Sequence, residues 1–224
     1  MIHGDIIDAQ APPKSPRMLK FHLIDGKSMN SQLDDIKKDI FSCFIPKRFF
    51  LTKGIGRDKN KLVAFEKSLR DAMIQPFNIV NVSSILPPHC IELSREEGLE
   101  NFKHGQIIFT VMSRNETNEF NRMVSASVGC AKPADSNNYG YLSEHHSFGQ
   151  GETAAGDYAE DLAAIMLATT MGEASFDIDQ HWDERKKAFI MCGKIVETKN
   201  ITATAVVEKK DEWTCVIAAA VFTS

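Results

Sequence analysis

The sequence of 224 residues lacks the run of roughly 20 apolar residues that a membrane-spanning helix needs. It has no CxxC pair, and its five cysteines are scattered, which is typical of reduced thiols in a cytoplasmic protein. It also lacks a basic excess: 26 Lys and Arg stand against 30 Asp and Glu, a net charge of −4. We therefore expect a cytoplasmic protein that binds neither nucleic acid nor an anionic membrane. The first residues show no signal peptide.

The segment 1–45 differs from the rest of the chain. It contains Ala11–Pro16, a proline-rich stretch that can form neither a helix nor a central strand. Helical spacing of apolar residues predicts a short helix around Ser31–Phe41. We expect residues 1–45 to be a partly disordered extension with one docking helix, and residues 46–224 to be the folded domain.

The segment that follows, up to Leu86, alternates between strand and helix signals. Phe49–Thr52 is predicted to be a strand, and Gly54–Gly56 is predicted to be the turn after it. Leu62–Gln75 has the periodicity of an amphipathic helix, which Pro76 ends. The β-branched segment Phe77–Leu86 is predicted to be one strand.

The remaining predicted elements are mostly strands. Glu152–Met171 is predicted to be a helix, and Trp213–Phe222 is so apolar that both of its faces should be covered. The apolar stripe of that helix is predicted to consist of Tyr158, Leu162, Ile165, Met166 and Thr169. Further strands are expected at 106–113, 122–131, 140–147, 188–197 and 201–207. Few helices among many strands, with no regular βα alternation, indicate an antiparallel α+β fold.

Two motifs are weak. Gly54-Ile55-Gly56 lacks the third glycine of a dinucleotide fingerprint, so a turn is the favoured interpretation. His89-Cys90 and His145-His146, with His181, lack the spacing that brings zinc ligands together. We predict no metal site.

Acidic residues show a clearer pattern. Residues 140–184 contain ten Asp and Glu and no Lys or Arg, and most of them fit the solvated face of the predicted helix. Glu144 differs because it interrupts a short predicted strand, where carboxylates are depleted. Taken alone, it could be an outward-facing strand residue.

Ser83-Ser84 lies at the end of a β-branched strand and just before Ile85–Pro88. A serine hydroxyl can attack the carbonyl that precedes it only if the backbone is held in a tight, distorted geometry. The simpler interpretation is a polar strand end that leads into a turn.

The sequence resembles the pyruvoyl-dependent arginine decarboxylases from about residue 46 to its end. The matching segments are Pro46–Gly54, Asn78–Pro88, Tyr139–His146, Gly156–Ala163 and Trp213–Phe222, all in the family's order. The resemblance implies a four-layer αββα sandwich of mostly antiparallel sheets flanked by helices. It also implies a trimer with active sites at subunit interfaces, or a dimer of such trimers.

The resemblance also implies that the chain cuts itself between Ser83 and Ser84. Ser84 Oγ would attack the Ser83 carbonyl, and the resulting ester would break down to a pyruvoyl group at position 84. The products would be a β chain, 1–83, and an α chain, 84–224. The covalent pyruvoyl cofactor would form a Schiff base with the substrate and act as the electron sink for decarboxylation.

Site roles follow from the resemblance position by position. Asn78 would polarise the oxyanion during cleavage. Glu144 would return a proton to Cα after carbon dioxide leaves, which needs a carboxyl group that is kept protonated. Glu66 would bind the substrate guanidinium through a bidentate contact. It could equally form a surface ion pair with Arg70, one turn further along the helix.

The predicted function is therefore conversion of L-arginine to agmatine and carbon dioxide by a self-processing lyase. One alternative is the same chemistry on another amino acid. The alternative from a different class is an uncleaved, non-catalytic scaffold or regulatory subunit. Neither the role of residues 1–45 nor the choice between polyamine synthesis and acid resistance follows from the sequence.

Overall fold

The computed structural model describes residues 33–34, 37, 44–100, 102–172, 182–183, 188–191 and 194–223. The chain forms two compact units, Met1–Ser42 and Cys43–Ser224. In the first unit, the described residues Leu33, Asp34 and Lys37 are helical, and Lys37 Nζ lies 3.6 Å from an Asp34 carboxylate oxygen. The rest of the helix predicted around Ser31–Phe41 lies outside the described residues.

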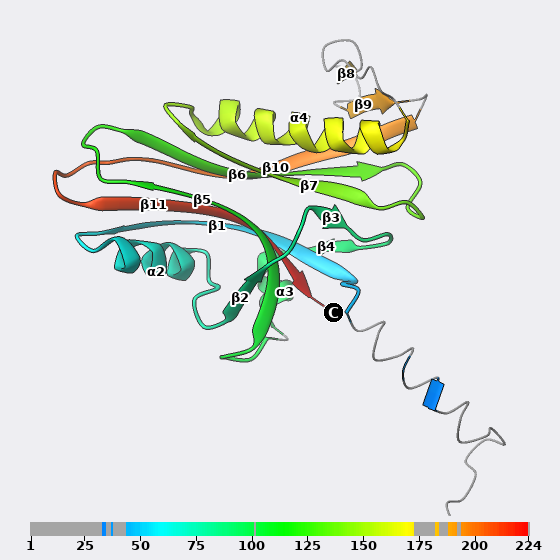
Figure 1. Ribbon diagram of the computed structural model, residues 1–224, viewed down its shortest axis with the longest axis horizontal. Coiled ribbons are helices and arrows are strands. Elements are labelled where there is room, and N and C mark those ends of the chain that lie inside the picture. Colours follow the sequence, from blue (N-terminus) through cyan, green and yellow to red (C-terminus); the bar gives the residue numbers. More distant parts are fainter. Residues whose placement is uncertain are drawn as a thin grey trace, which may run out of the picture. The chain divides into compact units, whose positions relative to one another are not determined.

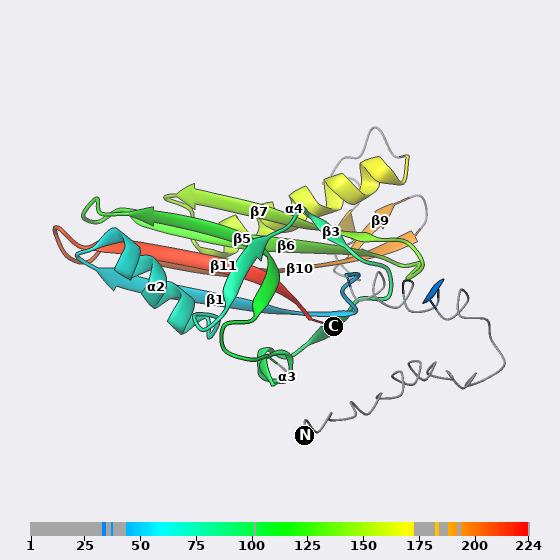
Figure 2. The same ribbon diagram turned by 60° about the horizontal axis from the view of Figure 1, so that its bottom comes forward.

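The second unit is built from two sheets packed face to face, each covered by a helix on its outer side (Figures 1 and 2). The first, here called the β11 sheet, has the order β2 (Asn78–Asn81), β5 (Ile107–Thr117), β11 (Trp213–Thr223), β1 (Arg48–Asp58), β4 (Ile91–Leu93). The second, the β6 sheet, has the order β3 (Ile85–Leu86), β7 (Gly140–Phe148), β6 (Met123–Pro133), β10 (Lys194–Val206), β9 (Ala188–Met191), β8 (Trp182–Asp183).

Helix α2 (Lys61–Asp71) covers the β11 sheet and helix α4 (Glu152–Thr170) covers the β6 sheet, while the short α3 (Arg95–Leu99) follows β4. The fold is therefore the predicted four-layer αββα sandwich (Figure 1). Its strand pairs are antiparallel except for β1 with β4 and β2 with β5, among the strands described. No described helix is long and apolar enough to cross a membrane.

Strand β11 forms the centre of the core, as its sequence predicts. Every residue from Cys215 to Val221 is fully buried. Ala218 and Ala220 face the β6 sheet, where they pack with Val128 and Leu142. The alternate side chains face α2 and its surroundings. A strand buried on both faces has no polar alternation, which is why this segment is apolar throughout.

The turn predicted at Gly54–Gly56 is wrong, because β1 runs straight through these glycines to Asp58. Both glycines lie under α2. A Cβ atom on Gly54 would lie 2.1 Å from the Ser68 carbonyl oxygen, and one on Gly56 would lie 2.0 Å from that of Ala64. The glycines therefore allow the helix backbone to approach the strand closely.

The predicted apolar stripe of α4 is also wrong. The helix buries its small residues instead, among them Ala155, Ala159 and Ala163, while Tyr158 remains 47% exposed. A Cβ atom on Gly129 of β6 would lie 2.1 Å from the Ala159 carbonyl, so the helix and the strand are in close contact. Small side chains are needed at such a contact, and among the larger ones Leu167 is buried whereas Tyr158 and Ile165 are exposed.

Segment Phe77–Leu86 is not the single strand that was predicted. Its first half, β2, pairs in parallel with β5 in the β11 sheet, and its second half, β3, pairs with β7 in the β6 sheet. Residues 82–84 cross between the two sheets. Helix α2 also ends at Asp71, before the predicted Gln75, and Met73 follows with a left-handed φ of 63°. Strands β4 and β8 and helix α3 were not predicted.

Candidate active site

The Ser83–Ser84 peptide bond lies in the crossing between the two sheets. On one side of it, the Val82 backbone N–H donates to the Thr110 carbonyl of β5 at 2.9 Å. On the other side, the Leu142 N–H of β7 donates to the Ser84 carbonyl at 2.7 Å. Neither backbone group of Ser83 has a hydrogen-bond partner among the described residues. The bond is therefore held from both sides but is itself outside both ladders.

The chain after Ser84 is rigid. Ile85 and Leu86 pair with Tyr141 and Gly140 of β7, and Leu86 is buried in the core between the sheets. The two prolines that follow, Pro87-Pro88, restrict the backbone further. Residue 84 therefore has a fixed position relative to β7.

Glu144 lies on β7, two residues beyond Leu142 and roughly 7 Å further along the strand. Its side chain has the same orientation as that of Leu142, toward the β11 sheet, where the Met112 backbone N–H donates to its carboxylate. Although the residue is exposed overall, partial burial of the carboxyl group raises the pKa of Glu144. The Met112 hydrogen bond and the charge of His146 act in the opposite direction but are weaker. The Glu144 carboxyl group therefore contacts the β11 sheet and does not simply point outward into solvent.

The two histidines after Glu144 have different surroundings. The His145 ring lies 4.5 Å from the Tyr158 ring, between centroids, and its Nε2 lies 2.8 Å from Gln150 Oε1. This side chain joins β7 to α4. His146 alternates with it and is exposed. The described residues contain no group of three or more His, Cys, Asp or Glu that could hold a metal ion.

The three cysteines among the described residues are not placed as nucleophiles. Burial raises the pKa of Cys90 to about 11 and that of Cys130 to about 12. Cys215 is fully buried in β11. All three are free thiols, and such raised values keep the thiol in its less reactive, protonated form.

Asn78 begins β2, and its side-chain Nδ2 donates to the Gly105 carbonyl at 2.7 Å. One of its two amide hydrogens is therefore used by the turn that precedes β5. The structure gives the residue a place at the start of the strand that leads to Ser83, but it does not bring the amide onto either serine.

Glu66 lies on α2 and pairs with Arg70, whose Nε donates to its carboxylate at 2.6 Å. The ion pair is the one-turn couple that the sequence left open. In Figure 1, α2 and β3 lie well apart along the sandwich, so Glu66 and Ser84 of one chain are not brought together. Leu62, one turn before Glu66, is 70% exposed.

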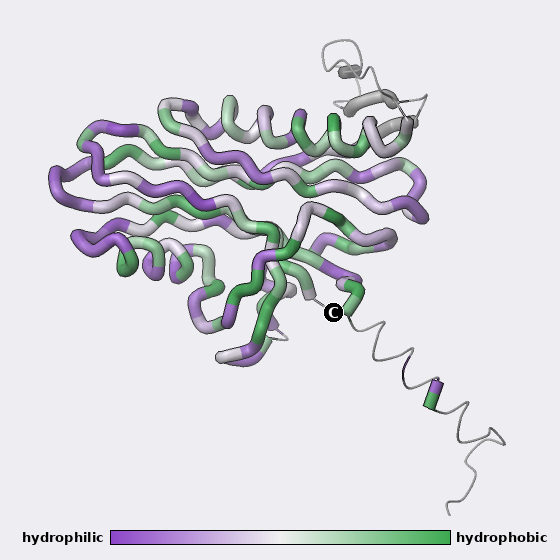
Figure 3. The backbone as a smooth tube through the Cα atoms, in the orientation of Figure 1, coloured by the Kyte–Doolittle hydropathy of each residue, from purple (hydrophilic) through white to green (hydrophobic). Residues whose placement is uncertain are grey.

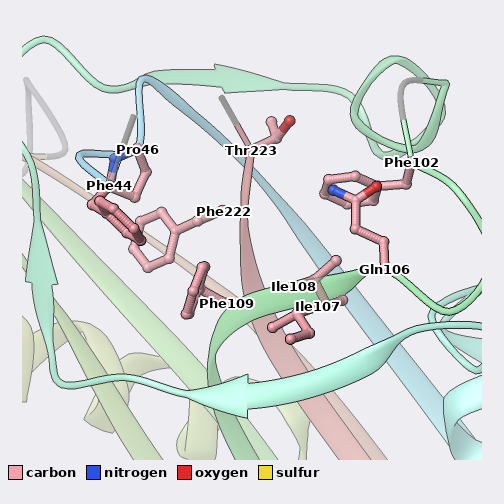
Figure 4. A pocket seen from close by; sticks show the side chains of 9 residues that line it. All are labelled: Phe44, Pro46, Phe102, Gln106, Ile107, Ile108, Phe109, Phe222 and Thr223. Carbon is pink, nitrogen blue, oxygen red and sulfur yellow. The ribbon is translucent and has the colours of Figure 1, made fainter. Parts of the chain in front are cut away.

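An apolar cavity of about 470 Å³ lies beside the crossing. Ser83 and Tyr139 contribute hydroxyl groups, and the other lining residues are Phe44, Ile45, Pro46, Val82, Ile85, Pro87, Pro88, Phe109 and Phe222. A neighbouring cavity of about 170 Å³ shares Phe44, Pro46, Phe109 and Phe222 and extends to Phe102 and Gln106 (Figure 4). No charged side chain lines either cavity among the described residues.

The crossing is surrounded by exposed apolar side chains. Figure 3 shows β3 and the adjacent end of β5 in the colours of hydrophobic residues, and β2 with both colours. The exposed members are Phe44, Ile45, Val80, Val82, Ile85, Ile107, Phe109 and Tyr139. A contiguous apolar surface of this kind marks an interaction site.

Sequence reasoning missed the groups that hold the crossing and Glu144 in place. Three of them, the N–H groups of Leu142 and Met112 and the Thr110 carbonyl, belong to the backbone and have no signature in the sequence. Phe44 and Ile45 were assigned to the extension, and they line the cavity beside Ser83. Their apolar character just before the first strand was the available signal.

Comparison with known proteins shows the family of the chain. The model of the family "Pyruvoyl-dependent arginine decarboxylase (PvlArgDC)" matches residues 48–224. The chain is 53% identical over 178 residues to a probable pyruvoyl-dependent arginine decarboxylase of Chloroherpeton thalassium, covering 80% of this chain and 97% of the relative. It is 52% identical over 180 residues to the pyruvoyl-dependent arginine decarboxylase of Thermoplasma volcanium, with the same coverage. A relative of Methanosarcina acetivorans, pyruvoyl-dependent arginine decarboxylase 2, is 51% identical over 178 residues, also with the same coverage.

These matches extend through nearly the whole of each relative and define a class of pyruvoyl-dependent decarboxylases. The chain belongs to the pyruvoyl-dependent arginine decarboxylase family.

Proposed function

We propose that this protein is a self-processing enzyme that decarboxylates L-arginine to agmatine and carbon dioxide. The observation that carries the proposal is the Ser83–Ser84 bond. It is held from two sheets in a chain whose relatives are named for this activity. The nearby carboxyl group of Glu144, with its raised pKa, supplies the second chemical group that the reaction needs.

Maturation begins with the Ser84 hydroxyl. Its oxygen attacks the Ser83 carbonyl carbon, the C–N bond breaks, and the amide nitrogen takes the proton, so an ester replaces the amide. Loss of the Ser84 Cα proton then breaks the Cβ–Oγ bond and releases the Ser83 carboxylate. The elimination leaves a dehydroalanine at position 84, which becomes an imine when a proton moves from its nitrogen to Cβ. Hydrolysis of this imine consumes one water, releases one ammonia and leaves a pyruvoyl group at position 84. The chain becomes two fragments, 1–83 and 84–224.

The surroundings of residue 84 fit this group. Leu142 N–H holds the carbonyl of residue 84 and would hold the same carbonyl in the pyruvoyl group. The adjacent cavity can exclude water from the ketone because its lining is almost entirely apolar. When formed, the group supplies an electron sink for the carbanion left by decarboxylation.

Glu144 is proposed to protonate the substrate Cα after carbon dioxide has left. A proton donor must hold its proton at the working pH, and partial burial favours the protonated form of this carboxyl group. Asn78 is proposed to support the oxyanion during cleavage. Its second amide hydrogen remains for that role, since the hydrogen bond to Gly105 uses one of two.

The substrate guanidinium is proposed to bind Glu66 of a second copy of the chain. The cavity beside Ser83 carries no carboxylate among its described lining residues, and α2, the helix that contains Glu66, lies apart from β3 in Figure 1. Exposed Leu62 beside Glu66, and the exposed apolar side chains around the crossing, are complementary surfaces for such a contact. A trimer, or a dimer of trimers, would repeat this contact at every site. The cysteine pattern supports a cytoplasmic location.

Two measurements test the proposal. A denaturing mass measurement of the purified protein should find the two fragments 1–83 and 84–224 rather than one chain of 25.0 kDa. A product assay should then detect agmatine and carbon dioxide from L-arginine. An intact chain would favour the non-catalytic scaffold. A cleaved enzyme that prefers lysine, ornithine or histidine would favour another substrate for the same chemistry.

A further inference from the structure

Thr110 contacts both residues that precede Ser83. Its side chain is fully buried in β5, and its hydroxyl donates to the Asn81 side-chain oxygen at 2.8 Å. Its carbonyl oxygen accepts the Val82 backbone N–H at 2.9 Å. One residue therefore fixes a side chain and a backbone group immediately before the bond that is cut.

The location of this contact matters because β2 is a short edge strand. It pairs with β5 over four residues only, and Asn81 opposite Thr110 is its last pair. The end of such a strand frays easily when only backbone bonds on one side hold it. A side-chain hydrogen bond at the last pair opposes that fraying, and the next fixed point is the Ser84 carbonyl on Leu142.

Only Ser83 lies between these fixed points. Attack by Ser84 Oγ needs the Ser83 carbonyl carbon at a near-attack distance, and a shift of about 1 Å is enough to lose much of the rate. A frayed β2 end would let Val82 and Ser83 move away from the sheet, whereas β7 would still hold Ser84.

We propose that Asn81 and Thr110 are positioning residues for self-cleavage, which fix the Ser83 carbonyl within reach of the Ser84 hydroxyl. The inference rests on the proposed function and assigns the pair to maturation rather than to arginine binding. The pair acts through Val82 and Ser83 and does not itself touch the reacting atoms.

The experiment compares rates of self-cleavage of the full chain during cell-free synthesis, followed by denaturing electrophoresis. Thr110→Val removes the hydroxyl at nearly constant shape and should slow cleavage by about tenfold, the effect of one hydrogen bond on the activation free energy. Thr110→Ser keeps the hydroxyl and should restore the rate. Asn81→Ala should slow cleavage as Thr110→Val does, and the double variant should be no slower, because the two residues make one contact.

The matched control is Thr52→Val. Thr52 is also buried, and its hydroxyl donates to the Ala72 carbonyl at 2.7 Å, under α2 and away from the crossing. It should lose stability to thermal unfolding but keep its cleavage rate. Equal slowing in Thr52→Val and Thr110→Val would overturn the proposal, and so would additive effects in the double variant.

A folding failure of Thr110→Val and a failure of the proposed function can each be distinguished from failure of this proposal. If Thr110→Val fails to fold, Asn81→Ala still decides the matter, because Asn81 is an exposed residue whose truncation leaves the core intact. Its cleavage at the wild-type rate would overturn the proposal. Absence of cleavage in the wild-type chain would instead contradict the proposed function.

Discussion

The pairing of β1 with β11, here called the seam, contrasts with the crossing at Ser83. The seam is a regular antiparallel ladder that extends from Arg48 opposite Thr223 to Asp58 opposite Trp213, and it is buried on both faces along β11. The crossing is exposed at Ser83, belongs to neither ladder and has Ser83 alone between its fixed points.

The contrast shows how a chain can be cut without coming apart. The fragment before Ser84 contains β1, α2 and β2, and the fragment after it contains β5 and β11. After the cut, β1 still lies between β11 and β4, and β2 still lies beside β5. The bond that is lost contributes nothing to either sheet, whereas the interface between the fragments includes the continuous antiparallel ladder of β1 and β11.

The largest effect is expected at Ser84. Ser84→Ala removes the hydroxyl that attacks the carbonyl, so the chain should remain intact and inactive in a denaturing mass measurement. Ser83→Ala should still cleave, because Ser83 contributes only its carbonyl. If the fragments 1–83 and 84–224 appear in Ser84→Ala, the assignment of the nucleophile is wrong.

Glu144→Gln should separate cleavage from turnover. The variant should still cut itself, since the proposed role of Glu144 is on the substrate, but kcat should fall by about 10²–10⁴-fold, as expected for the loss of a general acid. The measurement is steady-state decarboxylation per cleaved chain. A cleaved variant of normal activity would remove Glu144 from the mechanism.

The dependence of kcat on pH tests the same role of Glu144 as a proton donor. Because the acid form of Glu144 is required, kcat should fall as pH rises through its pKa. Partial burial raises that pKa, so the fall should lie above the pH range in which an ordinary glutamate titrates. In Glu144→Gln this limb should be absent from the residual activity.

Glu66→Gln should lower kcat/KM for arginine by about one to two decades. The estimate follows from the roughly 1.5–3 kcal/mol that a hydrogen bond to a charged group contributes. Arg70→Gln is the matched control, because it breaks the same ion pair but leaves the carboxylate in place. It should keep arginine turnover.

Discrimination against uncharged citrulline should shrink in Glu66→Gln only. Unchanged kinetics in both variants, with a stability change of a few tenths of a kcal/mol, would identify a simple surface pair.

The smallest effect concerns the seam. Gly56→Ala places a Cβ atom 2.0 Å from the Ala64 carbonyl, so α2 must shift away from β1. We expect a loss of about 1–3 kcal/mol in the free energy of unfolding, measured by denaturant titration. Gly151→Ala, where nothing lies within 4 Å of the added atom, should lose less. Equal losses would show that the close helix contact does not matter.

The sequence predicted the parts of the fold that depend on local pattern. The apolar run of β11 and the limits of α4 are examples, and both strands of the β6–β7 pair were expected close to where they lie. Gly54 and Gly56 were misinterpreted because their reason is the backbone of α2, which is distant in sequence. The β-branched composition of 77–86 could not show that the chain changes sheets at residue 82.

The candidate site residues could be named from the sequence, but their arrangement in space could not. Ser83, Ser84 and Glu144 form part of segments that resemble a known family. The structure places the two serines in the crossing before β3, where the Ser84 carbonyl accepts from Leu142 of β7, two residues before Glu144. Glu66 could be named but not placed, because its partner belongs to another copy in our proposal. The backbone donors, such as Leu142 N–H, carry no side-chain signal at all.

The position of β11 has a consequence for timing. This strand lies between β1 and β5, so the five-stranded sheet cannot close until residues 213–223 have been synthesised. Thr110 of β5 holds the residues before the cut. Its partner in β11, Val221, is present only once that strand has been synthesised. The proposed cleavage therefore waits for nearly the whole described chain. A nascent chain that still lacks its last strand is protected from cutting itself too early.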